Sequence, residues 1–162
     1  MVQSMLREDK MYRGIPENHD PSVQGGMLAD TNKIDWVELG EGVKFKMLRY
    51  CKVTGDWVLY VQLQPGVKFG RHQHISPAEF YVTKGLLTFE TGEAGPGVYG
   101  YESIGEIHEE AAGMEVTEFI YFGHGPVSFI DANDQVQFIA DLEFYKNAWE
   151  GNLPNDIVDH GA

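Results

Sequence analysis

The sequence predicts an all-β protein with a single domain, folded as a sandwich or a closed barrel. From Ile34 onward, short runs rich in β-branched and aromatic residues alternate with turn residues. Only residues 141–150 have the spacing of a helix. About nine or ten short strands with so little helix are typical of sandwiches and barrels. A chain of 162 residues can bury one such core and is too short for two.

The chain begins with a polar stretch that has no core of its own. Residues 1–30 are broken by Gly14, Pro16 and Pro21, and we interpret them as an N-terminal arm. His19 lies in this arm, within an Asn-His-Asp-Pro sequence, and a solvated turn residue is its expected role.

Side chains that face inward and outward alternate with a period of two along a strand. This pattern is clearest from Trp57 to Gln64, where Trp57, Leu59, Val61 and Leu63 occupy every second position. Residues 92–97 are rich in Gly and Pro and are expected to form a loop. Strands are expected at residues 34–39, 43–50, 57–64, around His72 and His74, 78–83, 86–91, 98–102, 114–122, 126–130 and 135–140.

One helix is predicted near the C-terminus. Leu142, Tyr145 and Trp149 recur at helical spacing, and Gly151 follows as a stop signal. We therefore assign the barrel and this helix to residues 31–151, and a tail to residues 152–162.

Composition excludes several classes of function. The net charge of −13 argues against binding to nucleic acids or to anionic membrane surfaces, which require basic patches. The longest apolar run, Trp57 to Val61, is too short to span a bilayer, and the N-terminus lacks a signal-peptide core. A single cysteine, Cys51, cannot form an internal disulfide, so a reducing, cytoplasmic location is expected.

His72 and His74 form the strongest chemical signal in the chain. Residues two apart on a strand point to the same face, so both imidazoles are expected to point toward one metal ion. A His-x-His pair alone is weak evidence, because most such pairs are surface or hydrogen-bonded histidines. The spacing of the glycines around the pair strengthens it, and His108 is the expected third ligand, contributed by a neighbouring strand. Neutral imidazoles suit several divalent metals, so this ligand set does not distinguish among them.

The pattern resembles the two sequence motifs of the cupin superfamily. This resemblance implies a double-stranded β-helix, or jelly-roll barrel, with one divalent metal ion per chain. The first motif is one residue short before Gly85, Ser103 stands where the second motif usually has Pro, and Ala112 where it often has Asn. The positions that match are Gly66, His72, His74, Glu79, Gly97, Gly105 and His108.

Two carboxylates are candidates for roles beside the metal. Glu79 has the spacing at which many cupins place a carboxylate ligand, and it could either bind the metal or bond to a neighbour. Glu102 precedes His108 by a short turn and is the expected catalytic carboxylate. It could accept the second N–H of a ligating histidine or position a water molecule on the metal.

Three segments are more specifically similar to acetylacetone-cleaving (β-diketone) dioxygenases and to anti-sigma-factor-like cupins: residues 79–85, 99–108 and 125–131. This resemblance implies Fe(II) as the favoured metal, with Zn, Ni or Mn as alternatives. It also implies Glu102 as an outer-sphere carboxylate. The expected substrate pocket consists of Phe69, Phe80, Glu90 and Phe119. Two of these depart from the family, which has a hydroxylated aromatic residue at the position of Phe80 and an arginine at that of Glu90.

The function implied by the resemblance is a metal-dependent dioxygenase that cleaves a C–C bond of a small β-dicarbonyl compound with O2. Two other functions remain open. One is another metal-dependent cupin enzyme, such as an aromatic-ketone dioxygenase or an isomerase. The other is a non-catalytic sensor that binds Zn and a small ligand. A homo-oligomer, either a dimer or a tetramer, is also expected, because cupin barrels commonly pair through their sheet edges.

Overall fold

A computed structural model describes residues 26–152 of the chain. Most of the expected arm and tail, with His19 and His160, lies outside the described residues. The all-β prediction with one short helix is confirmed. The elements are β1 (Val37–Gly40), β2 (Val43–Tyr50), β3 (Trp57–Leu63), β4 (Lys68–Phe69), β5 (His72–His74), β6 (Ala78–Lys84), β7 (Leu87–Phe89), β8 (Gly92–Ala94), β9 (Tyr99–Glu102), β10 (Ile107–His108), β11 (Ala111–Gly113), β12 (Thr117–Gly123), β13 (Val127–Ile130), β14 (Val136–Ala140) and α1 (Leu142–Trp149).

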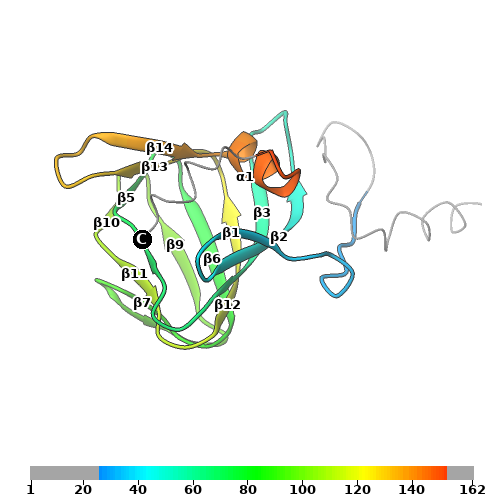
Figure 1. Cartoon of the computed structure of the whole chain (residues 1–162), viewed down its shortest axis with the longest axis horizontal. Coiled ribbons are helices and arrows are strands. Elements are labelled where there is room, and N and C mark those ends of the chain that lie inside the picture. The colour runs from blue at the N-terminus through cyan, green and yellow to red at the C-terminus, as the bar shows by residue number, and fades with distance from the viewer. Residues whose placement is uncertain (1–25, 153–162) are drawn as a thin grey trace, which may run out of the picture.

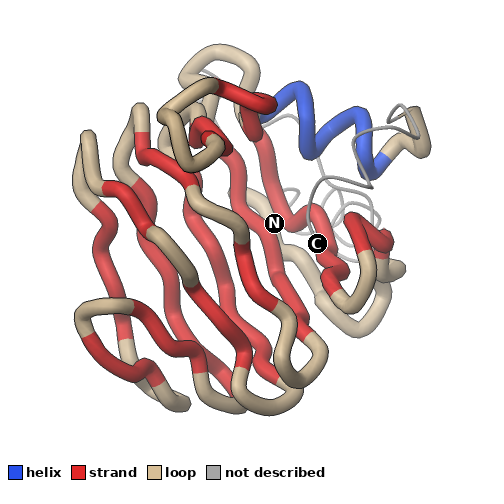
Figure 2. Tube along the Cα trace, turned by 60° about the vertical axis from the view of Figure 1, so that its left-hand side comes forward, coloured by secondary structure: helices blue, strands red, loops and turns tan. Residues whose placement is uncertain are grey.

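The strands form a jelly-roll barrel from three antiparallel sheets. The largest sheet has six strands in the order β1-β2-β3-β12-β6-β9. Two four-stranded sheets have the orders β10-β5-β13-β14 and β4-β11-β7-β8. Figure 1 shows the large sheet on one side of the barrel and the two smaller sheets on the other, and Figure 2 shows α1 beside one end of the strands.

The barrel interior follows the alternation that the sequence predicts. In β3, Trp57, Leu59, Val61 and Leu63 are buried, whereas the residues between them are partly exposed. The helix α1 begins at Asp141, whose side chain caps it by accepting the backbone N–H of Phe144 at 2.9 Å. Burial of apolar area from the sheets and α1 stabilises one continuous core.

The short strands differ most from the sequence-based expectation. Residues 92–94 form β8 and not a loop, and the strand expected at 114–122 is β12, preceded by a separate β11. The strand β10 was not predicted. Strands of two or three residues are too short to show a period, and their hydrogen-bonding partners lie far away in the sequence, so only the folded chain defines them. Within residues 26–152, no helix is long and apolar enough to cross a bilayer.

Candidate metal centre

Three buried histidines converge at one point inside the barrel. The candidate ligand atoms of His72, His74 and His108 all lie within 4.8 Å of one another. His72 and His74 come from β5, and His108 comes from β10. The three rings lie 5.1–5.3 Å apart between centroids.

Strand pairing explains why these side chains meet. In β5 the two histidines are buried and Gln73 between them is partly exposed, as the pleat of a strand requires. The strand β10 pairs with β5 in an antiparallel register that places His108 directly opposite His72. Directly opposed residues share a face of the sheet, so His108 points into the barrel as well. Gly105 has a φ of 83° in the turn before β10 and donates its N–H to the carbonyl of His74 at 2.7 Å.

The hydrogen bonds of two histidines leave one ring nitrogen of each available as a ligand. The Nδ1 of His72 lies 2.8 Å from the carbonyl oxygen of Gly70, which can only accept a hydrogen bond. The Nδ1 of His108 lies 3.4 Å from Oε2 of Glu90. With Nδ1 protonated, a neutral imidazole keeps its lone pair on Nε2.

Three of the other ring nitrogens are unsatisfied, and this observation tests whether a metal fits the site. Both ring nitrogens of His74 and the Nε2 of His108 are buried without a hydrogen-bond partner. Buried polar groups are rarely left unpaired in native proteins, and an unexplained set often indicates an ion. A divalent cation among three neutral imidazoles would satisfy one nitrogen on each ring, so the residues fit a metal site.

The buried environment disfavours the charged form of two of the three histidines. Burial lowers the pKa of His72, and it lowers the pKa of His74 to about 3, with further lowering from His72 and His108. The imidazole rings of His72 and His74 are therefore uncharged near neutral pH. Metal binding requires the neutral form, so His72 and His74 need no deprotonation to bind an ion.

Glu102 lies on the cavity side of the histidines. It ends β9, and its carboxylate oxygens lie 3.5 Å from Nε2 of His74 and 3.5 Å from Nε2 of His108. Burial raises the pKa of Glu102 to about 7, with a further increase from Glu106 and an opposing hydrogen bond from Tyr121. Glu102 therefore faces the nitrogens of His74 and His108 that are free to bind a metal.

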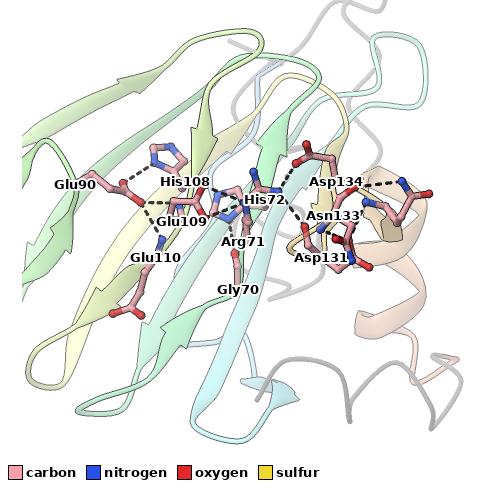
Figure 3. A network of polar contacts seen from close by, with 11 residues as sticks. Gly70, Arg71, His72, Glu90, His108, Glu109, Glu110, Asp131, Asn133 and Asp134 are labelled. Atoms are coloured by element: carbon pink, nitrogen blue, oxygen red, sulfur yellow. Dashed lines mark hydrogen bonds and ion pairs between the residues drawn. The ribbon is translucent and has the colours of Figure 1, made fainter.

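One role considered for Glu102 was to accept the second N–H of a histidine ligand. In the structure, the carbonyl of Gly70 faces Nδ1 of His72, and the carboxylate of Glu90 faces Nδ1 of His108. Glu90 was expected from the sequence to line the substrate pocket. In the structure it is exposed at the barrel rim and is not among the residues that line the cavity. Its Oε1 accepts the backbone N–H groups of Glu109 at 2.6 Å and Glu110 at 2.9 Å, and its Oε2 faces His108 (Figure 3). Burial raises the pKa of Glu90, but these hydrogen bonds outweigh that effect and lower the pKa to about 2.

Glu79, the carboxylate considered as a further metal ligand, lies on the face of its strand that points away from the barrel interior. Its neighbours Ala78 and Phe80 point into the barrel, so Glu79 points outward. Its carboxylate accepts hydrogen bonds from the hydroxyl of Tyr99 and, at 2.7 Å, from Nε2 of His124. The structure thus shows the second alternative for Glu79, a carboxylate bonded to neighbours, and places it away from the three histidines.

An apolar cavity of about 70 Å³ adjoins the histidines. Phe69, Phe80 and Phe119, three of the residues suggested for a substrate pocket, line this cavity. Roughly 10–15 Å³ by this measure holds one water molecule, so the cavity has room for a small molecule. Phe89 lines it as well. Four further aromatic residues that line the cavity were not expected from the sequence: Phe45, Tyr121, Phe129 and Tyr145.

A network of ion pairs at the rim was also missed. Arg71 donates through Nε to the carboxylate of Glu109 at 2.9 Å and through Nη1 to the carbonyl of Asp131 at 3.0 Å (Figure 3). Arg71 also pairs with Asp134. In the sequence, Arg71 directly precedes His72 and Glu109 directly follows His108. This adjacency to the candidate ligands was the one sequence feature that could have indicated the ion pair. The pairing itself depends on the register of β5 and β10.

The jelly-roll barrel and its three-histidine cluster are those of a cupin. The model of the ChrR cupin-like domain family matches residues 24–128, and the chain belongs to this family.

Similar proteins with known structure or activity agree with this assignment. An acetylacetone-cleaving enzyme of Acinetobacter johnsonii is 28% identical over 117 residues, which cover 67% of this chain and 76% of that enzyme. The crystal structure of an acetylacetone dioxygenase from Acinetobacter johnsonii superimposes with a TM-score of 0.73 at 24% identity, covering 84% of this chain and 97% of that one. A structure of Rhodobacter sphaeroides SigE in complex with the anti-sigma ChrR has a TM-score of 0.52 at 17% identity, covering 58% of this chain and 51% of that one.

Proposed function

We propose that the protein is an Fe(II)-dependent dioxygenase that cleaves a C–C bond of a small β-dicarbonyl compound. The observation that carries the proposal is the convergence of three buried histidines, two of them with unsatisfied ring nitrogens, beside an apolar cavity that contains one buried carboxylate. The similarity to an acetylacetone-cleaving enzyme supports the choice of reaction. His72, His74 and His108 would hold the ion.

A bound ferrous ion would supply redox chemistry toward O2 and a Lewis-acidic centre for the two substrate oxygens. Three imidazoles carry no charge, so the ligand set leaves the full positive charge available to an anionic enolate. A β-dicarbonyl compound must lose one proton to become that enolate, from the central carbon of the keto form or from the oxygen of the enol form. Glu102 is the buried carboxyl group in the cavity, and its pKa, raised by burial to about 7, suits it to accept this proton near neutral pH.

The aromatic wall has a separate role. Phe69 and Phe119 pack edge to face with ring centroids 6.5 Å apart, and Phe80 stacks on Phe89 at 5.2 Å. These rings exclude bulk water from the space beside the histidines. In a dry cavity the electrostatic interactions of the bound enolate are stronger, and fewer side reactions with water occur.

The size and charge of the cavity define the substrate further. Its lining residues include no lysine and no arginine, and Glu102 is their one acidic side chain. A substrate that carries its own carboxylate would therefore be repelled and left without a counter-ion. We propose a compact, uncharged dicarbonyl compound, with acetylacetone as the first compound to test.

Anaerobic loading with Fe(II), followed by measurement of O2 uptake with acetylacetone and with hydroxyaryl ketones, tests the proposal. We expect O2 consumption that depends on both iron and substrate, with a carboxylate and a 2-oxo-carbonyl compound as products. The matched control substrate is acetoacetate, whose carboxylate should make it much poorer. Absence of iron-dependent O2 uptake with every dicarbonyl would rule out the dioxygenase.

A non-catalytic ligand-binding role is the second candidate. The family takes its name from ChrR, which is an anti-sigma protein in the Rhodobacter complex. Tight binding of redox-inactive Zn together with no O2 uptake would favour this role. Turnover of hydroxyaryl ketones alone would instead favour a different metal-dependent cupin enzyme.

A further inference from the structure

Glu90 contacts both a candidate metal ligand and the chain segment that follows it. Its Oε1 accepts the backbone N–H groups of Glu109 and Glu110, and its Oε2 lies 3.4 Å from Nδ1 of His108 (Figure 3). We propose that Glu90 is a positioning residue that holds His108 in the tautomer and orientation that metal binding requires. The inference rests on the metal site of the proposed function.

The hydrogen-bonding capacity of Glu90 and His108 determines which nitrogen of His108 carries the proton. An ionised carboxylate only accepts, so the Nδ1 of His108 must carry the proton when it faces Glu90. The lone pair of the neutral ring then lies on Nε2, the nitrogen that faces Glu102 at 3.5 Å on the cavity side. Ligating histidines are commonly oriented in this way by a carboxylate or a backbone carbonyl.

The other two histidines are held differently. His72 faces the backbone carbonyl of Gly70, which no substitution of a side chain removes. His74 has no hydrogen-bond partner on either nitrogen. Among the three histidines, His108 is thus the one whose tautomer is held by another side chain.

Glu90 is itself held in place by the rim network. Both carboxylate oxygens of Glu109 accept from Nε of Arg71 at 2.9 and 3.0 Å, and Arg71 binds the carbonyl of Asp131. The backbone of Glu109 is therefore anchored to β5 and to the start of the β13–β14 turn. This anchoring fixes the N–H groups that orient Glu90 and hence the oxygen that faces His108.

The substitution Glu90→Gln tests the role directly. An amide has one oxygen and one NH2 group, and the two backbone N–H groups at 2.6 and 2.9 Å should keep the oxygen at the Oε1 position. The NH2 group would then face Nδ1 of His108, and two donors cannot face each other. We expect the proton of His108 to move to Nε2, which removes the lone pair needed for the metal. Long-range ¹H–¹⁵N spectra of the metal-free protein report this change of tautomer.

Zinc affinity provides the second readout and requires no catalytic activity. In competition with a chromophoric chelator, Glu90→Gln should bind Zn about 10–100-fold more weakly than the wild type. The matched control is Glu93→Gln, which makes the same change at an exposed carboxylate on β8 and should bind Zn like the wild type. A second variant, Glu109→Gln, weakens the ion pair with Arg71 but keeps the backbone N–H groups and the carboxylate of Glu90, so it should reduce Zn affinity less than Glu90→Gln does.

Comparison with Glu90→Ala separates positioning from a purely structural role. Ala removes the acceptor for two backbone N–H groups, so it should lower the melting temperature more than Gln does. It leaves His108 free to adopt either tautomer, so it should reduce Zn affinity less than Gln does. A purely structural role would make Ala the worse variant in both measurements.

Two results would overturn the inference. If Glu90→Gln bound Zn as tightly as the wild type with an unchanged His108 tautomer, Glu90 would not position His108, and the metal site would stand. If the wild type bound no Zn, the metal site would fail together with the inference. Neither result depends on whether the protein consumes O2, so the dioxygenase proposal is tested separately.

Discussion

At the scale of single residues, the three histidines differ in the number of hydrogen bonds that their ring nitrogens make. This difference determines which ring a bound metal would stabilise most. His72 and His108 each have a partner for Nδ1, whereas both nitrogens of His74 are buried and unpaired. An unsatisfied buried polar group costs about 1–3 kcal/mol. Coordination would relieve this cost most directly at His74, so metal binding is expected to raise the thermal stability of the barrel.

Replacing His108 by Ala should abolish stoichiometric metal binding. The ring of His108 is one of three converging ligands, and two imidazoles hold a divalent ion much less tightly than three. Metal content after Zn loading and gel filtration measures the effect, and circular dichroism checks that the fold is retained. Full metal content in the variant would mean that the third ligand lies elsewhere. His72→Ala and His74→Ala should behave in the same way.

The substitution Glu102→Gln should keep the fold and most of the bound metal while lowering turnover by about 10–100-fold. The volume is unchanged and the three histidines remain, but the amide can no longer accept a substrate proton. Steady-state O2 uptake and metal analysis separate the two effects, with Glu93→Gln as the control. Unchanged turnover on a confirmed substrate would show that Glu102 has no part in the reaction.

At the scale of secondary-structure elements, the packing of β6 on β9 shapes the cavity. Gly100 of β9 pairs with Phe80 of β6, and a Cβ atom at Gly100 would lie 2.1 Å from the ring of Phe80. The phenyl ring therefore covers Gly100, and it can lie there only because glycine has no side chain. This contact couples the choice of residue on an edge strand to the wall of the candidate substrate site.

Gly100→Ala should therefore destabilise the protein by about 1–3 kcal/mol, because the ring of Phe80 must leave its packed position. Chemical denaturation measures the loss, and binding of small ligands should weaken as the ring enters the cavity. The double variant Gly100→Ala with Phe80→Leu should recover part of the stability, since the two positions are in direct contact. Simple additivity of the two changes would refute the proposed contact.

A second element-scale feature joins three strands on the outer face of the large sheet. Glu118 of β12 accepts hydrogen bonds from Tyr60 and, at 2.8 Å, from Gln62, both on β3. Lys84 of β6 lies 3.7 Å away. Burial raises the pKa of Glu118, but the hydrogen bonds outweigh this and lower the pKa below its usual value of 4.5.

The lowered pKa of Glu118 predicts a pH-dependent contribution to stability. A carboxylate with a depressed folded-state pKa stabilises the native state above its unfolded pKa, and the stabilisation is lost as pH falls through the folded pKa. Glu118→Gln should therefore be less stable than the wild type at pH 7, with a difference that shrinks below about pH 4.5. Urea titrations at pH 7 and pH 3.5 measure this. A difference that stays constant with pH would exclude the ionised form as the cause.

At the scale of the whole molecule, we predict that the protein forms a dimer or a tetramer. Within residues 26–152, the six-stranded sheet ends at β9, where Tyr99 and Tyr101 are 56% and 60% exposed. An edge strand with exposed aromatic side chains favours pairing with another copy. Sedimentation velocity over a range of concentrations measures the state, and a monomer at the highest concentration would contradict the prediction.

The sequence by itself determined the features that depend on local periodicity. The alternation in β3 indicated which side chains enter the barrel, and the spacing of Leu142, Tyr145 and Trp149 indicated α1. The His-x-His pair of β5 indicated two imidazoles on one face. These predictions succeed because neighbouring residues in a regular strand or helix have fixed relative directions, whatever the rest of the chain does.

The tertiary structure alone decided the features that depend on register between distant strands. Glu79 and Glu102 both had a plausible spacing, but only the folded sheet shows that Glu79 faces outward while Glu102 reaches His74 and His108. The contact of Glu90 with His108 joins residues 18 positions apart in sequence. Such contacts depend on which strands pair and in which register, and that choice follows from burial over the entire barrel, because a shift by one residue would exchange its inner and outer faces.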